Sequence, residues 1–269
     1  SSVAAETKKY LFETRDGKKI ESVLIPEKDR NTLCVSTQSG CPLDCKFCAT
    51  GLMGFKRNLS AGEILDQYVF AARDAGKENI TNIVYMGMGE PLINYDSTVK
   101  SLRILTDGTN KSISRTRITL STAGITTKII ELADSGLRVK LALSLHSPFD
   151  DIRSRIMPVN KRFPLKDVLK SLSYYAEKTK TRITFEYTML KGVNDRPEDI
   201  NELIKICRKI PSKMNLIPFN SISHMAPEGI SSELRPTGEK NIEIFADSLR
   251  NAGITVMLRN TQGSDIAAA

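Results

Sequence analysis

Short apolar segments alternate with segments of helical periodicity through most of this 269-residue sequence. Apolar segments such as 31–37, 82–88 and 139–145 are rich in Ile, Val and Leu on both faces, which is typical of buried parallel strands. The first long helical segment begins with the capping-box pattern of Ser60 and Glu63. Strands and helices that alternate in this way predict a parallel sheet of right-handed βαβ units. The expected fold class is therefore α/β.

The N-terminal part of the chain has a different pattern. Residues 10–26 form two alternating runs around Asp16-Gly17, a strong turn signal that predicts a β-hairpin. We therefore predict an N-terminal β-hairpin extension over residues 1–30 and a core domain over residues 31–269.

Polar segments follow four of the predicted strands. They are "GMGEP" (87–91), "STAG" (121–124), "SLHSP" (144–148) and "PFNS" (218–221). Because the carboxyl ends of parallel strands meet at one end of a barrel, these segments are expected to share one rim and one ligand. A closed or partly closed barrel fits this arrangement better than an open two-layer fold.

Three of the five cysteines lie in the segment "GCPLDCKFCATG", directly after the first predicted barrel strand. Their spacing is Cys41-x-x-x-Cys45-x-x-Cys48. A zinc site usually offers four ligands, often as two pairs, but no second CxxC pair exists and the histidines are only His146 and His224. Soft thiolates suit an iron–sulfur cluster better. Three thiolates on a cubane cluster leave one iron open to a small molecule.

Charge and hydropathy restrict the partners and the location. The net charge of +8 favours a polyanionic partner, although many basic proteins bind no nucleic acid. No apolar run reaches the roughly 18 to 20 residues needed to span a bilayer. The opening "SSVAAETKKY" lacks the apolar core of a signal peptide. We therefore expect a cytoplasmic protein without membrane contact, whose cysteines are kept reduced.

The cysteine loop after the first strand of a βα barrel resembles the signature of the radical S-adenosylmethionine (SAM) enzymes. The resemblance implies a partial (β/α)6-type TIM-like barrel and a [4Fe–4S] cluster whose open iron chelates the amino and carboxylate groups of SAM. An electron from the cluster then cleaves SAM and yields a 5′-deoxyadenosyl radical. "GMGEP" resembles the family's motif for the SAM amino group, with Glu90 as the acceptor and Gly89 allowing close backbone approach.

Longer blocks resemble a narrower group, the RlmN/Cfr family of radical SAM adenine RNA methyltransferases. The blocks include "TLCVSTQSGCPLDCKFCATGLMGFKRNL", "YMGMGEPLINY", "IMPVNKR", "FEYTMLKGVND" and "MNLIPFN". They extend from about Glu21 to the C-terminus. The resemblance implies methylation of an adenine in large-subunit ribosomal RNA. The RlmN-like branch, which we favour, acts at carbon 2 and also on transfer RNA. A monomer that receives electrons from a donor such as flavodoxin is expected.

The resemblance also assigns roles to individual residues. Cys41, Cys45 and Cys48 match the cluster ligands. Glu21, in "KKIESVLIPE", matches the family's proposed general base, and Cys34, in "TLCVST", matches its second catalytic cysteine. The implied SAM contacts are Gly89, Glu90, Ser121, Ser144, Leu145, His146 and Asn220.

The family chemistry explains why a thiol is needed at Cys34. Carbon 2 of adenine is electron-poor and cannot attack a sulfonium methyl group. In the family, one SAM methylates a cysteine near the C-terminus and a second SAM supplies the radical that activates that methyl group. Release of the product then needs a base and a second thiol, which forms a disulfide with the first cysteine. Taken by itself, Cys34 would more often be a buried strand cysteine.

The sequence departs from the family pattern at both ends. The methyl-accepting cysteine is expected directly after Ala269, where the sequence stops. The helical accessory domain that usually precedes the barrel is also absent, so we expect a trimmed fragment. Cys207 lies in a predicted helix and is expected to be a core residue.

Several alternatives stay open at this point. A carbon-8 adenine methyltransferase shares the same motifs. Another radical SAM enzyme, such as a glycyl-radical activase, or an RNA-binding module stabilised by zinc or a cluster would also carry the cysteine loop. The basic segments 55–59 and 161–166 could contact phosphates. Phe55 and Phe219 are expected to pack rather than to stack on a base.

Overall fold

The computed structural model describes residues 7–27, 30–76, 80–108 and 112–259. In this part of the chain nine strands form one sheet, in the order β1-β2-β3-β6-β7-β8-β9-β10-β11. Neighbouring strands from β3 to β11 run parallel, whereas β2 pairs antiparallel with both β1 and β3. The predicted α/β class and parallel sheet are confirmed. The strands are β1 (Lys8–Glu13), β2 (Lys19–Glu27), β3 (Arg30–Cys34), β6 (Asn82–Tyr85), β7 (Ile118–Thr122), β8 (Lys140–Ser144), β9 (Ile183–Met189), β10 (Ser212–Pro218) and β11 (Val256–Leu258).

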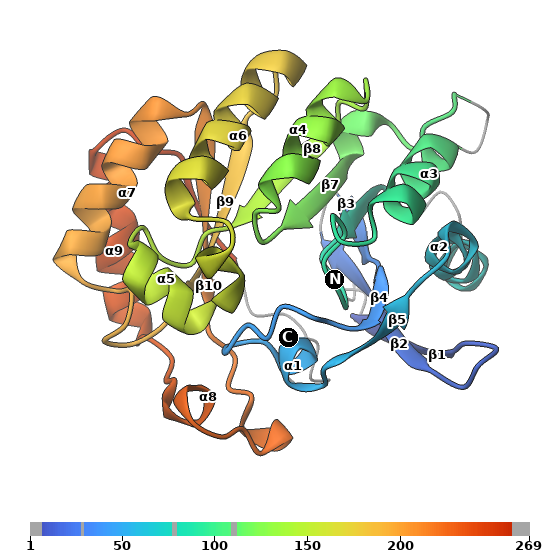
Figure 1. Ribbon diagram of the computed structural model, residues 1–269, viewed down its shortest axis with the longest axis horizontal. Coiled ribbons are helices and arrows are strands. Elements are labelled where there is room, and N and C mark those ends of the chain that lie inside the picture. Colours follow the sequence, from blue (N-terminus) through green and yellow to red (C-terminus); the bar gives the residue numbers. More distant parts are fainter. Residues whose placement is uncertain (1–6, 28–29, 77–79, 109–111, 260–269) are drawn as a thin grey trace, which may run out of the picture.

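The longer helices form an arc around the outside of the strands (Figure 1). They are α2 (Ala61–Ala75), α3 (Tyr95–Leu105), α4 (Thr126–Asp134), α6 (Leu165–Thr179), α7 (Pro197–Lys209) and α9 (Glu239–Asn251). Shorter helices are α1 (Ala49–Leu52), α5 (Asp150–Ile156) and α8 (Ile230–Glu233), and 3₁₀ turns span Arg115–Arg117, Pro158–Lys161 and Ser223–Met225. None of the described helices is long and apolar enough to cross a membrane.

The sheet forms a partial barrel, because within the described residues β11 pairs with β10 alone. Outward-facing strand residues such as Leu33, Ile83 and Leu141 are fully buried beneath the helices. The alternate residues face the inside of the barrel. There, polar side chains such as Ser121 and Glu186 stand among apolar ones, so the inner face is less apolar than the sequence pattern suggested. A polar inner face is expected where a barrel receives a ligand.

The predicted hairpin is confirmed and belongs to the main sheet. β1 pairs with β2, and β2 pairs in turn with β3, the first parallel strand. Tyr10 and Phe12 of β1 pack edge-on against Phe70 of α2, with ring centroids 5.7 and 5.4 Å apart. The hairpin therefore continues the barrel wall and covers one end of α2.

A two-stranded sheet that the sequence did not predict borders the cysteine loop. It pairs β4 (Gln38–Gly40) with β5 (Phe55–Asn58). Gly40 has φ +76°, and a Cβ at this position would lie 1.8 Å from the carbonyl oxygen of Gly54. Only glycine allows the two strands to approach in this way. The contact closes the loop that carries the three cysteines.

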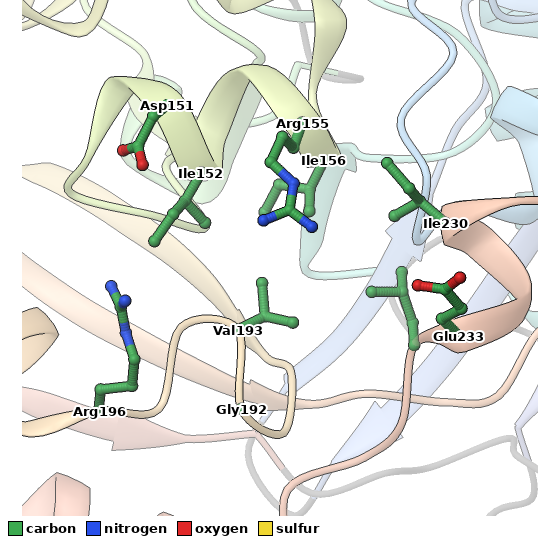
Figure 2. A pocket seen from close by; sticks show the side chains of 10 residues that line it. Asp151, Ile152, Arg155, Ile156, Gly192, Val193, Arg196, Ile230 and Glu233 are labelled. Carbon is green, nitrogen blue, oxygen red and sulfur yellow. The ribbon is translucent and has the colours of Figure 1, made fainter.

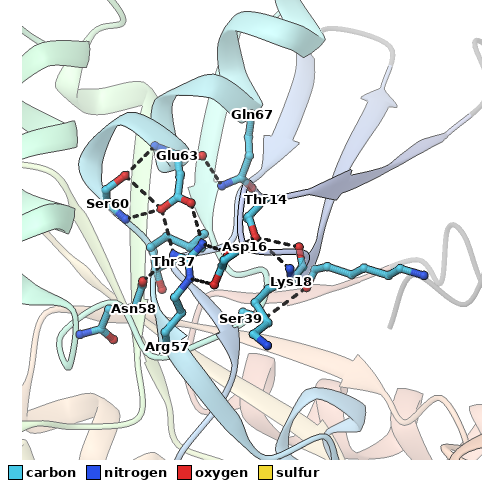
Figure 3. A network of polar contacts seen from close by, with 12 residues as sticks. Thr14, Asp16, Lys18, Thr37, Ser39, Arg57, Asn58, Ser60, Glu63 and Gln67 are labelled. Atoms are coloured by element: carbon cyan, nitrogen blue, oxygen red, sulfur yellow. Dashed lines mark hydrogen bonds and ion pairs between the residues drawn. The ribbon is translucent and has the colours of Figure 1, made fainter.

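Arg57 of β5 joins this small sheet to the hairpin and to α2 (Figure 3). Its Nη2 lies 2.7 Å from Asp16 Oδ1 in the hairpin turn and 2.7 Å from Glu63 Oε1 at the start of α2. Both carboxylates raise the pKa of Arg57, and they fix the position of its guanidinium between the hairpin turn and α2. Arg57 is thus engaged in ion pairs within the fold, and phosphate contact by the segment 55–59 stays an untested possibility. Phe55 is 45% exposed, so its expected packing role is wrong.

The predicted capping box of α2 is confirmed. The backbone nitrogen of Ser60 donates to Glu63 Oε2 at 2.9 Å, and that of Glu63 donates to Ser60 Oγ at 3.2 Å. One turn later, Gln67 is buried beneath the sheet. Its Oε1 accepts from the hydroxyl of Ser22 at 2.6 Å and from the backbone nitrogen of Ser36 at 2.8 Å. Gln67 thereby ties α2 to β2 and to the chain just after β3.

We predict that Gln67→Ala lowers the free energy of unfolding by about 2 kcal/mol, because it leaves the buried amide of Ser36 without its acceptor. The measurement is urea denaturation followed by circular dichroism. Asp66→Ala, an exposed change on the same helix, serves as the control and should stay within about 0.5 kcal/mol of the parent. Equal stability of the two variants would contradict the role given to Gln67.

Candidate active site at the barrel rim

The loops that follow β3, β6, β7, β8 and β10 lie at one end of the parallel sheet and form the rim. Glu90, in the loop after β6, is 4% exposed and binds two of these loops together. Its Oε1 accepts from the backbone nitrogen of Leu92 at 3.1 Å, and its Oε2 accepts from that of Ala123 at 2.8 Å. Burial raises the pKa of Glu90 to about 7. The carboxyl group is therefore a structural link as well as the expected acceptor for SAM.

Gly89 is required by the protein's own packing. It has φ +101°, and a Cβ there would lie 2.5 Å from Cβ of Gln38. Gln38 Oε1 in turn accepts from the backbone nitrogen of Glu90 at 2.8 Å. The glycine thus lets the loop after β6 pack onto β4, the strand that leads into the cysteine loop.

The three clustered cysteines lie in one tight loop. Cys41 follows β4, and Cys48 precedes α1 and donates its backbone nitrogen to the carbonyl of Cys45 at 3.1 Å. Burial raises the pKa of Cys41 to about 12 and raises that of Cys45 well above its ordinary value, and neighbouring cysteines add to both shifts. The Cys41 and Cys45 thiols are therefore protonated when no metal binds, and cluster binding would displace their protons.

The donor set fits an iron–sulfur cluster. All three thiols are free and none is used in a disulfide. In the described residues no three Cys, His, Asp or Glu side chains converge on the position of a single metal ion. A cubane cluster binds each thiolate to a different iron atom, so its ligands surround a larger volume than one ion occupies. Three soft thiolates from one loop suit that cofactor.

The loop after β8 brings the expected SAM contacts His146 and Leu145 to the cysteine loop. His146 has φ +52°, and its ring lies 4.5 Å from that of Phe47 between the second and third cysteines. Its Nδ1 accepts from the backbone nitrogen of Thr188 at 2.9 Å, and burial lowers its pKa to about 3, so the ring is neutral. Leu145 is fully buried, with its backbone nitrogen bound to the carbonyl of Glu186 at 3.0 Å.

The remaining expected SAM contacts are brought together only in part. Ser121 on β7 and Ser144 on β8 are half-buried on strands that pair with each other. Asn220 follows β10 and is half-buried at the same rim. No hydrogen bond joins Asn220 to the other expected contacts in the part of the chain that the structure describes. The preceding Phe219 packs in an apolar cluster with Ala123, as expected.

Glu21 and Cys34 share one face of the sheet. Cys34 pairs with Val23 across β2 and β3, and Glu21 lies two residues from Val23 on the same face. Lys9 Nζ lies 2.9 Å from Glu21 Oε1, whose side chain is 40% exposed. Burial raises the pKa of Cys34 to about 11, against an opposing effect of Arg259. At neutral pH Cys34 is therefore a thiol that must lose its proton before it can attack another sulfur.

Arg153 on α5 is a site residue that the sequence did not reveal. It is fully buried, and its guanidinium donates hydrogen bonds to backbone carbonyls of the rim loops. Nη2 donates to the carbonyls of Ala123 at 2.7 Å and Ser144 at 3.0 Å, and Nε donates to that of Leu145 at 3.0 Å. The sequence contained one signal for this role: Arg153 lies on the same helix face as the apolar residue Ile156, where a charged side chain is unusual.

Other residues lie away from this rim. Cys207 packs against the main core from α7, as expected. A cleft of about 290 Å³ lies between α5, the loop before α7 and α8, and Figure 2 shows Arg155 and Glu233 on either side of it. None of the expected SAM or cluster residues lines this cleft, so it is not the candidate SAM site.

The buried carboxyl group of Glu90 predicts a pH dependence of stability. In the folded chain Glu90 keeps its proton up to about pH 7, whereas its ordinary pKa is 4.5. The ionised form is therefore favoured in the unfolded chain between these values, and stability is lost as the pH rises. The free energy of unfolding of Glu90→Gln, minus that of the parent, should therefore increase by up to about 3 kcal/mol as the pH rises from 4.5 to 7. Denaturation of both proteins without iron or SAM measures this difference, and a constant difference would contradict it.

Comparisons with known proteins agree with the arrangement of this rim. The family model of the radical SAM superfamily matches residues 35–205. A probable dual-specificity RNA methyltransferase RlmN from Dictyoglomus turgidum is 49% identical over 97% of this chain and 74% of its own length. The dual-specificity RNA methyltransferase RlmN of Syntrophobacter fumaroxidans is 45% identical over 98% of this chain and 75% of its own length.

A solved structure gives the same result in three dimensions. The crystal structure of a radical SAM methyltransferase from Sphaerobacter thermophilus superposes with a TM-score of 0.91. It is 42% identical, and the match covers 98% of this chain and 76% of that one. Membership of the superfamily implies that SAM and an iron–sulfur cluster are the cofactors. On this identity and coverage, the chain belongs to the RlmN family of radical SAM RNA methyltransferases.

Proposed function

We propose that this enzyme methylates carbon 2 of an adenine in large-subunit ribosomal RNA, and that transfer RNA is a second substrate. The observation that carries the proposal is the shared face of Cys34 and Glu21 beside the rim. A reaction that ends by releasing RNA from a protein sulfur needs such a thiol and a base, whereas direct methyl transfer to a nucleophile needs no second thiol. The name of the relatives, dual-specificity RNA methyltransferase, supports two RNA substrates.

The cofactors are proposed to be a [4Fe–4S] cluster and SAM. Cys41, Cys45 and Cys48 are the ligands of the cluster, which together with SAM supplies a carbon-centred radical. Glu90 accepts hydrogen bonds from the SAM ammonium through the lone pairs that the two backbone amides leave free. The other contacts proposed for SAM are Gly89, Ser121, Ser144, Leu145, His146 and Asn220.

Cys34 and Glu21 are proposed to complete the reaction. Cys34 loses its proton and its thiolate attacks the protein sulfur that tethers the RNA, so that an S–S bond forms as the bond between that sulfur and the methylene carbon breaks. The electron pair of the broken bond stays with the carbon, which takes up a proton and becomes the methyl group of the released RNA. Glu21 is the base, and Lys9 holds its carboxylate at the open face. The tethering cysteine is the one that the family resemblance places after Ala269; residues 260–269 before it lie outside the described part of the chain.

The remaining features of the proposal concern the whole enzyme. The net charge of +8 suits an RNA substrate, and the exposed residues Lys161, Arg162 and Lys166 remain candidates for phosphate contacts. We place the enzyme in the cytoplasm as a monomer that is reduced by a donor such as flavodoxin. The division into a hairpin extension over 1–30 and a core over 31–269 stays a prediction.

The identity of the product tests the proposed function. The full-length enzyme, reconstituted under anaerobic conditions, is given SAM, a reductant and either a fragment of large-subunit ribosomal RNA or transfer RNA. Digested RNA should contain 2-methyladenosine, identified by chromatography and mass spectrometry against authentic 2-methyl and 8-methyl standards. Formation of 8-methyladenosine would overturn the assignment to carbon 2. Methylation of ribosomal RNA alone would remove transfer RNA from the proposal.

The role of Cys34 is tested by the fate of the RNA. In a chain that carries the methyl-accepting cysteine, Cys34→Ala should stop after the RNA has bonded to the protein, because no thiol is present to release it. We expect a band that migrates slowly on a denaturing gel and disappears on RNase treatment. Cys207→Ala, which removes a core thiol on α7, is the control and should turn over without this adduct. Normal turnover by Cys34→Ala would show that the thiol is dispensable.

A further inference from the structure

Among the described residues, no carboxylate contacts the buried cation Arg153 directly. Its side chain is 0% exposed. Its hydrogen bonds go to the carbonyls of Leu145, Ala123 and Ser144, and Nη1 donates to the amide oxygen of Asn160 at 2.6 Å. These acceptors are all neutral. A charge removed from water in this way is costly unless an opposite charge balances it.

The carboxylate of Asp150 acts on Arg153 through its charge and through Asn160, which lies between them. Asn160 Nδ2 donates to Asp150 Oδ1 at 2.8 Å, while its amide oxygen accepts from Arg153. Asp150 is exposed, so solvent screens its charge. Asp150 therefore compensates only part of the buried positive charge of Arg153.

The cysteine loop packs against the same helix. The backbone nitrogen of Lys46 donates to the carbonyl of Ile156, three residues beyond Arg153, at 2.8 Å. Cys45 and Phe47 pack in one apolar cluster with Ile156 and with Ala123, whose carbonyl Arg153 binds. The buried cation thus lies beside the loop that holds the three thiols.

We propose that Arg153 is a positioning residue whose buried charge balances the anionic iron–sulfur cluster and raises its reduction potential. This inference rests on the cluster proposed above. Three thiolates make the loaded site negative, and each electron that the cluster accepts adds one more negative charge. A nearby cation in a medium of low dielectric constant stabilises the reduced state more than the oxidised state. The same guanidinium binds carbonyls of the loops that carry the proposed SAM contacts. One side chain therefore affects both the position of those loops and the charge around the cluster.

The test is a redox titration of the cluster in the full-length protein, reconstituted under anaerobic conditions. Dithionite supplies the electrons, and the reduced cluster is followed by its electron paramagnetic resonance signal, normalised to bound iron. Arg153→Gln should lower the ratio of reduced to oxidised cluster at a fixed potential by at least about tenfold, a shift of about 59 mV. Arg155→Gln is the matched control. It removes the same charge from the same helix, but Arg155 is exposed and faces the cleft of Figure 2. Its potential should match the parent.

A second variant separates charge from structure. Arg153→Lys keeps the charge but loses the planar guanidinium that binds several carbonyls, so it should lower the free energy of unfolding. At the same fixed potential, its ratio of reduced to oxidised cluster should stay within a factor of about two of the parent ratio. This variant also serves as the test if Arg153→Gln does not fold. A tenfold drop in Arg153→Lys, or an unchanged ratio in a folded Arg153→Gln, would overturn the inference. A parent protein that binds no iron would instead overturn the proposed cluster.

Discussion

The rim depends on one residue, Ala123, whose backbone nitrogen and carbonyl are each bound by a buried side chain. The backbone nitrogen of Ala123 donates to the buried carboxyl group of Glu90, and its carbonyl accepts from the buried guanidinium of Arg153. A buried polar group that loses its partner is costly, so neither side chain can be removed without leaving an orphan. Through the backbone of Ala123 the loop after β6, the loop after β7 and helix α5 keep a common arrangement. The expected SAM contacts are distributed over the same loops.

The cysteine loop is attached to this arrangement by backbone geometry. Gly40 lets β4 and β5 approach, and Gly89 lets the loop after β6 pack on Gln38 of β4. Lys46 is bound to the end of α5, and the ring of Phe47 lies against His146. Three thiols that lie close together in the sequence are therefore fixed relative to the loop after β6, the end of α5 and the loop after β8. A radical reaction needs such fixed positions, since the cofactors supply the chemistry and the protein supplies orientation.

The sequence predicted the course of the chain and most of the chemistry. The hairpin, the alternation of strands and helices, and the capping box of Ser60 and Glu63 are local patterns, and each is found. The pattern was less successful where a residue's partner lies far away. The basic segment 55–59 was one that could contact phosphates, yet Arg57 within it is bound by Asp16 and Glu63. A basic side chain has the same local signature in both cases, so only the position of its partners distinguishes them.

The sequence by itself determined the parallel α/β fold, the family and the residue types of the site, because periodicity and close motifs are properties of neighbouring residues. Tertiary structure alone decided which of these residues meet. It brings Glu21 onto the face of Cys34 through the register of β2 on β3, and it engages Glu90 with two backbone amides. It also buries Arg153 beside the cysteine loop. The charge and hydrogen bonding of a side chain depend on the groups that folding places around it, and those groups are distant in sequence.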